Sequence, residues 1–118
     1  MTKQKYTFDI LGGYLMSDNT VNAEYLAHCI YIVCINDKVS YDIMLSHKNR
    51  KNGIDFTIKY WICHFINTEL KHDDYYHGHT CTYAQVKNFN KLHDNSLDKV
   101  YEILRKDIEN EYDELSNY

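Results

Sequence analysis

The chain has 118 residues, which is the length of one ordinary domain and too short for two. Its balance of 44% hydrophobic and 25% charged residues is typical of a soluble protein, and its net charge of −4 argues against a broadly basic nucleic-acid-binding surface. Because no apolar run approaches the roughly 20 residues of a membrane span and the N-terminus shows no signal-peptide pattern, we expect a single domain over residues 1–118 in the cytoplasm of a bacterium or a host cell.

The first half of the chain is predicted to contain strands and one helix. A short strand is expected over residues 5–10 and a helix over residues 19–28. Two segments rich in Ile, Val and Tyr, residues 29–35 and 39–45, flank the turn-prone Asn36-Asp37-Lys38 and predict a β-hairpin. Over residues 54–60, apolar side chains alternate with polar ones, which is the period of a half-buried strand.

The last third of the chain is predicted to be helical. Thr82 and Gln85 have the spacing of a capping box, so a short helix should begin there and end at a turn over residues 93–95. From Leu97 onward, apolar residues recur at steps of three and four, the pattern of one helix face. We therefore expect a continuous helix over residues 97–115 that buries Leu97, Val100, Leu104, Ile108 and Leu115.

Together these elements predict an α+β fold. An antiparallel sheet of three or four strands would be covered by helices, two of them at the C-terminus. An all-α bundle is the alternative, because residues 25–33 and 61–70 also fit a helix.

Residue usage points to an AT-rich gene. Asn, Lys, Ile, Tyr and Asp supply 56 of the 118 residues, whereas Gly, Ala, Arg and Pro supply nine. Codons of the first group are rich in A and T, and those of the second in G and C. Phages, mobile elements and low-GC bacteria fit such a gene, as do some large DNA viruses and protists. The excess of Tyr and Asn is therefore partly mutational and weak as a sign of function.

Cysteine and histidine gather between residues 63 and 81, a segment that holds six of the eleven in the chain. In an extended strand, residues two apart face the same side, so His77, His79 and Cys81 would converge on one ion, with His72 or Cys63 as a fourth ligand. Imidazole and thiolate are ligands that Zn²⁺ prefers. The segment predicts a zinc site, although the Cys-x-x-Cys spacing of specific zinc motifs is absent. A His-rich loop beside a buried thiol is the alternative.

The sequence offers no assembled catalytic set, so we lean toward a protein without enzymatic activity. No His-Glu-x-x-His arrangement joins an acid to the histidines, and no phosphate-binding glycine loop occurs. Lys48, Arg50 and Lys51 form a basic loop that favours nucleic acid. Because the acidic last helix would repel phosphate, direct nucleic-acid binding is not the function we expect.

Negative charge is concentrated at the end of the chain. Residues 94–118 hold eight acidic and three basic residues, whereas residues 1–93 hold nine acidic and ten basic residues. A solvated helix face accounts for such a pattern in many proteins, and an acidic surface that docks on a basic partner is the functional alternative. The residues predicted to contact a protein partner are Glu109, Glu111, Asp113, Glu114, Tyr112, Asp73, Asp74, Tyr75 and Tyr76.

The hypothesis favoured by these features is a non-catalytic protein-binding module that carries no cofactor. In general style it resembles the small inhibitors that phages and mobile elements direct against host nucleases or defence complexes, and equally bacterial immunity proteins. The alternatives are a small zinc-binding protein, structural or hydrolytic, and a nucleic-acid-binding accessory protein.

Overall fold

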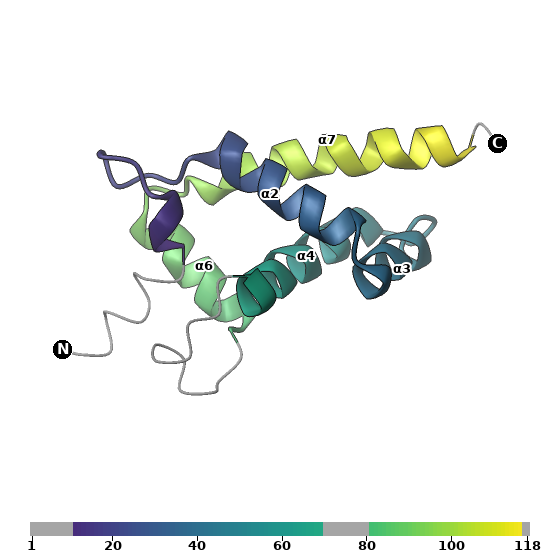
Figure 1. The fold of residues 1–118 in the computed structure, drawn as a ribbon, viewed down its shortest axis with the longest axis horizontal. Coiled ribbons are helices and arrows are strands. Elements are labelled where there is room, and N and C mark those ends of the chain that lie inside the picture. The colour runs from purple at the N-terminus through teal and green to yellow at the C-terminus, as the bar shows by residue number, and fades with distance from the viewer. Residues whose placement is uncertain (1–10, 70–80, 117–118) are drawn as a thin grey trace.

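The computed structural model describes residues 11–69 and 81–116, and this part of the chain is mostly helical (Figure 1). In chain order the elements are the 3-10 turn η1 (Gly12–Tyr14), α2 (Ala23–Ile35), α3 (Lys38–Ser46), α4 (Gly53–Glu69), α6 (Tyr83–Leu92) and α7 (Leu97–Ser116). Helix α2 packs against α7 and α4, and α3 packs against α2 and α4. Helix α6 lies against α4 and leads into α7.

The predicted α+β fold is wrong, and the all-α alternative fits. Over the described residues no strand forms, and Leu15 and Val21 make an isolated β-bridge. The two arms of the predicted hairpin lie in α2 and α3. The turn between them is where the sequence predicted it, but it joins helices. Asp37 caps α3 by accepting a hydrogen bond from the Ser40 amide at 3.0 Å. The strand predicted over residues 5–10 lies outside the described residues.

The preference of Ile, Val and Tyr for strands is overridden in α2 by packing. The residues that α2 buries follow the helical period: Leu26, Ala27, Ile30 and Cys34. Tyr25 and Ile32 also lie on the outer side of the same helix. The apolar run is therefore continuous, and the helical period within it is hidden.

Helix α4 replaces the strand predicted over residues 54–60. Burial again follows the helical period, because Phe56 is 54% exposed whereas Ile58 and Trp61 are fully buried. The helix begins where the backbone of Gly53 approaches the His47 carbonyl so closely that a Cβ atom would overlap it. A glycine is therefore required at this position.

The two predicted C-terminal helices are confirmed. Thr82 and Gln85 make both hydrogen bonds of the capping box at the start of α6. In the turn after α6, Asp94 and Asn95 have φ angles of 57° and 56°. Helix α7 buries Leu97, Val100, Leu104, Ile108 and Tyr112, and Leu115 is only half-buried.

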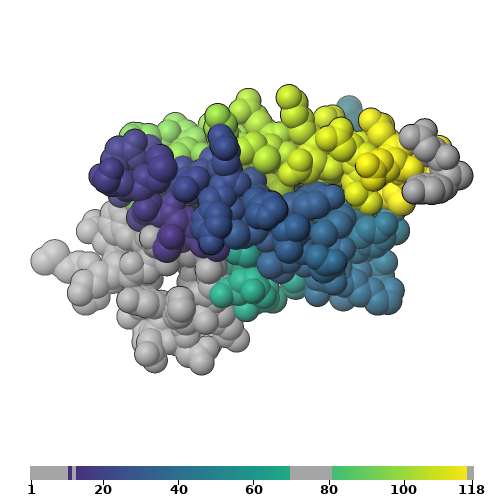
Figure 2. All heavy atoms as spheres, turned by 45° about the horizontal axis from the view of Figure 1, so that its top comes forward, coloured from purple at the N-terminus to yellow at the C-terminus, as the bar shows by residue number. Residues whose placement is uncertain are grey.

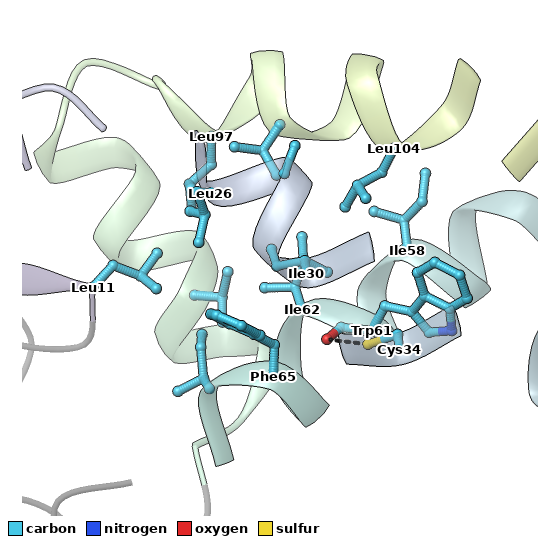
Figure 3. Close-up of a cluster of buried hydrophobic side chains, with 14 of the residues drawn as sticks. Leu11, Leu26, Ile30, Cys34, Ile58, Trp61, Ile62, Phe65, Leu97 and Leu104 are labelled. Carbon is cyan, nitrogen blue, oxygen red and sulfur yellow. Dashed lines mark hydrogen bonds between the residues drawn. The ribbon is translucent and has the colours of Figure 1, made fainter. Parts of the chain in front are cut away.

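The core lies where α2, α4 and α7 meet (Figure 3). The Trp61 indole N–H donates to the Ser40 carbonyl at 3.1 Å, and the Cys34 thiol donates to the Trp61 carbonyl at 3.6 Å. The first contact joins α4 to α3, and the second joins α4 to the inner side of α2. The outer side of α2 lies on the surface. None of the described helices is long and apolar enough to cross a membrane.

Candidate functional site

Helix α2 is apolar on its outer side as well as on its inner side. Glu24 is its one formally charged residue. Tyr25 is 56% exposed and Ile32 is 45% exposed, and His28 between them is also exposed. These three residues are three and four positions apart, so they form a ridge along the outer side of the helix.

The acidic residues of α7 fall on two different sides of that helix. Asp107, Glu111 and Glu114 recur at steps of four and three and lie on the flank that faces α2. Glu109 and Asp113, which are four residues apart, are exposed on the opposite flank with Lys106. The acidic tail predicted from the sequence is thus two surfaces, and the first lies beside the exposed side chains of α2.

A shallow hollow of about 400 Å³ opens to solvent between α2 and α7. Atoms of the two helices lie side by side on one face of the molecule in Figure 2. We call this space the acidic hollow. It is lined by His28, Tyr31, Ile32, Asp107, Asn110, Glu111 and Glu114.

The carboxylates of the acidic hollow act on the tyrosine beside them. The Tyr31 hydroxyl donates to Glu111 Oε1 at 3.2 Å. The pKa of Tyr31 is raised to about 12, mainly by burial and further by the negative charges of Glu111, Asp107 and Glu114. Burial also raises the pKa of Asp107, and nearby His28 opposes that effect. The hollow therefore concentrates negative charge next to the apolar ridge of α2.

A second hollow of about 380 Å³ lies on the other side of the ridge, between α2 and α4. An aromatic cluster forms part of it, since the Tyr14 ring centroid is 5.4 Å from that of Tyr25 and 6.1 Å from that of Phe65. The pKa of Tyr14 is raised to about 12, first by burial and then by Cys29. We call this space the apolar hollow. It is lined by Tyr14, His28, Cys29, Ile32, Val33, Phe65 and Glu69.

The other residues predicted to contact a partner are placed differently. Tyr112 is 7% exposed, and its hydroxyl donates to the Met44 carbonyl, so it belongs to the core instead of an interface. The acidic and aromatic segment predicted beside it lies outside the described residues: Asp73, Asp74, Tyr75 and Tyr76.

Two of the predicted metal ligands come close together. The Cys81 amide donates to Asn67 Oδ1 at 2.7 Å, and Asn67 Nδ2 donates to the Cys81 carbonyl at 3.2 Å. Cys63 lies one turn before Asn67 on α4, so it faces the same way. Burial raises the pKa of Cys81 to about 12, with a further contribution from Cys63, and burial also raises the pKa of Cys63. Burial therefore favours the neutral thiol at both positions, and a metal ion would have to displace the two protons in order to bind.

The remaining predicted ligands, His72, His77 and His79, lie outside the described residues. Among residues 11–69 and 81–116, no three or more Cys, His, Asp or Glu side chains are grouped so that they would hold an ion. The zinc site stays a prediction.

One residue of the basic loop between α3 and α4 makes a contact within the molecule, and the other two are exposed. Lys48 donates to the Ser116 hydroxyl at 2.9 Å, whereas Arg50 and Lys51 are exposed. Lys48 and Arg50 line a hollow of about 220 Å³ together with Arg105, which forms an ion pair with Asp55. The structure thus adds Arg105 to the predicted basic cluster and Asp55 as an opposing charge.

The outer ridge of α2 was missed by the sequence interpretation. The signal was present, because Tyr25, His28 and Ile32 have helical spacing on the side opposite Leu26 and Ile30. This spacing was not recognised, because residues 29–35, which include Ile32, were predicted to form a strand.

Comparison with known proteins adds no relationship: no family model matches the sequence, and no curated protein or solved structure is significantly similar to it.

Proposed function

We propose that this chain is a non-catalytic protein-binding module that docks a basic partner on the acidic hollow. The observation that carries this proposal is the row formed by Asp107, Glu111 and Glu114 against the apolar ridge of α2. Surface carboxylates alone are common on solvated helices. Carboxylates that border exposed apolar side chains are typical of a binding surface, because the apolar part supplies affinity and the charges supply orientation.

The sign of the charge selects the partner. A surface rich in carboxylates attracts Lys and Arg and accelerates encounter with a basic protein. The same charges repel nucleic-acid phosphates and anionic lipid headgroups. A protein whose own function requires a basic groove, such as a nuclease or another nucleic-acid-binding enzyme, fits this description. The small size, the acidic face and the AT-rich composition favour an inhibitor of phage or mobile-element origin, or a bacterial immunity protein.

The proposal is tested by two double variants with equal changes in net charge. The first, Asp107→Lys with Glu114→Lys, reverses the acidic hollow. The second, Glu109→Lys with Asp113→Lys, reverses the opposite flank of α7 and serves as the matched control. Glu111 is left unchanged because it binds Tyr31.

Tagged wild-type and variant proteins are used to recover partners from a lysate of the native host, and the recovered partner is then measured by surface plasmon resonance. We expect the first variant to lower the association rate by about tenfold or more, since steering contributes factors of about 10–1,000. The control should change it by less than about threefold. Binding to the wild type should weaken between about 0.1 M and 1 M salt, where the Debye length falls from about 10 Å to 3 Å. Equal binding of both variants, or the absence of any stoichiometric partner, would refute the proposal.

A further inference from the structure

We propose that the partner binds with a pair of side chains, a Lys or Arg in the acidic hollow and an apolar side chain in the apolar hollow, presented by a basic amphipathic helix. This inference rests on the proposed function, and it adds a second and chemically different contact. The acidic hollow alone would select a partner by its positive charge. The two hollows together would also require an apolar side chain at a set distance from that charge.

The two hollows form one continuous surface because they share two side chains. His28 and Ile32 line both, so the ridge of α2 is the common wall between a carboxylate-lined space and an aromatic one. A partner that reaches the carboxylates of α7 therefore also covers Ile32. Its contact then extends to the far side of the ridge, where Val33 and Phe65 line the apolar hollow.

The apolar hollow has the chemistry of an anchor site. Tyr14 and Phe65 supply its aromatic lining, and Ile32 and Val33 supply its aliphatic lining. Tyr25 packs against Tyr14 from outside the hollow. Aromatic and aliphatic walls around a concave space favour the burial of one apolar side chain, which is the usual form of an interface hot spot. Glu69 also lines this hollow and adds a carboxylate to it.

The geometry of one helix sets the spacing of the pair. The hollows lie on opposite sides of α2, and an α-helix with its side chains is about 10–12 Å across. On a partner helix, positions seven residues apart are separated by about 10.5 Å at 1.5 Å per residue. The expected partner segment therefore carries its cation and its apolar anchor about two turns apart.

A second copy of this chain does not fit the surface as well. In a two-fold symmetric dimer the same patch meets itself. Asp107, Glu111 and Glu114 of one copy would then approach those of the other, and like charges would oppose association. A basic partner has no such penalty.

The test uses synthetic helical peptides of about 20 residues as probes of the intact protein. The first carries Leu and Lys on one helix face, with each Leu seven positions from a Lys and Gln at the other positions. The second replaces each Leu by Ala and is basic only, and the third replaces each Lys by Gln and is apolar only. We expect the first peptide to bind about tenfold more tightly than either of the others, because it alone fills both hollows.

Two variants locate the contact. Ile32→Ser removes the shared apolar wall, and Leu92→Ser removes a comparable side chain of α6, since Ile32 is 45% and Leu92 is 49% exposed. Ile32→Ser should weaken the Leu–Lys peptide about tenfold and leave its salt dependence unchanged. Leu92→Ser should have no effect. Both changes are at exposed positions, so melting temperature serves as a check that each variant is folded.

Alkylation by N-ethylmaleimide gives an independent measurement. The half-buried Cys29 lines the apolar hollow, and the half-buried Cys63 does not line either hollow. A saturating Leu–Lys peptide should slow the alkylation of Cys29 severalfold and leave that of Cys63 unchanged. Equal protection of both thiols would place the peptide elsewhere and overturn the inference.

The outcomes separate this inference from the proposed function. If the basic-only peptide binds as tightly as the Leu–Lys peptide and loses affinity with salt, the two-hollow inference is overturned and the acidic docking surface stands. If Ile32→Ser and Leu92→Ser bind alike, the inference fails in the same way. If neither basic peptide binds, this inference fails and the charge-reversal experiment decides the proposed function.

Discussion

Replacing Leu104 by Ala tests whether α7 is held in the bundle as described. Leu104 is fully buried, and its side chain points from α7 toward Ile58 of α4 (Figure 3). Truncation of a buried Leu removes its transfer free energy and leaves a cavity, which together cost about 2–5 kcal/mol. The full burial of this side chain places it in that range. A domain of 118 residues is stable by roughly 6–18 kcal/mol at 0.05–0.15 kcal/mol per residue. The variant should therefore fold with greatly reduced stability.

Urea unfolding followed by circular dichroism at the helical band measures this change, with Leu92→Ala as the control. Leu92 is about half exposed, so its truncation should cost less than about 1 kcal/mol. A thermal melt should show Leu104→Ala lowered by roughly 8–20 °C, at about 4 °C per kcal/mol for this size. A loss below about 1 kcal/mol for Leu104→Ala, or equal losses for both variants, would contradict the packing of α7 on α4 and α2.

Three further predictions concern other parts of the fold. Gly53→Ala should destabilise the protein by more than about 1 kcal/mol, measured by the same urea unfolding, because the added Cβ would overlap the His47 carbonyl. Thr82→Ala should cost about 0.5–2 kcal/mol through loss of the capping box, whereas Thr68→Ala, whose hydroxyl bonds back to the His64 carbonyl, should cost less than about 0.5 kcal/mol. The free energy of unfolding should fall as pH rises from about 10 to 12. The pKa values of Tyr14 and Tyr31 are about 12 in the folded protein and about 10 in the unfolded chain. The unfolded chain therefore releases protons in this pH range whereas the folded protein does not, which favours unfolding. A flat pH dependence of urea midpoints in that window would argue against this pair.

The accuracy of the sequence interpretation depended on the kind of signal. The capping box of Thr82 and Gln85 and the apolar stripe from Leu97 were predicted correctly, since specific hydrogen bonds and a polar opposite face define them locally. Residues 29–35 were predicted wrongly, because the apolar residues of α2 occupy both sides of the helix. In such a run, β-branched composition and helical burial predict different structures, and only contacts with α4 and α7 decide between them.

The candidate site was predictable in part. The sequence showed that acidic residues gather in the last helix, but it did not show which of them lie beside α2. Glu111 and Glu114 line the hollow between α2 and α7, and Glu109 and Asp113 do not, although all four are within six positions. That division depends on the placement of α2 beside α7, and it follows from packing between segments about 80 residues apart, as in the bond from Tyr31 to Glu111.

An AT-rich gene is a competing explanation for the exposed apolar residues, but it does not account for how they are arranged on α2. A codon bias toward Ile and Tyr predicts single apolar side chains scattered over the surface, in the way that Phe56 and Leu92 are exposed on α4 and α6. Such a bias does not explain why Tyr25 and Ile32 lie on one ridge, with the apolar hollow on one side and a row of three carboxylates on the other. The pairing of Ile32→Ser with Leu92→Ser compares the two explanations directly. If both apolar residues are products of codon usage, neither substitution affects binding; if the ridge is a docking surface, only the substitution of Ile32 does.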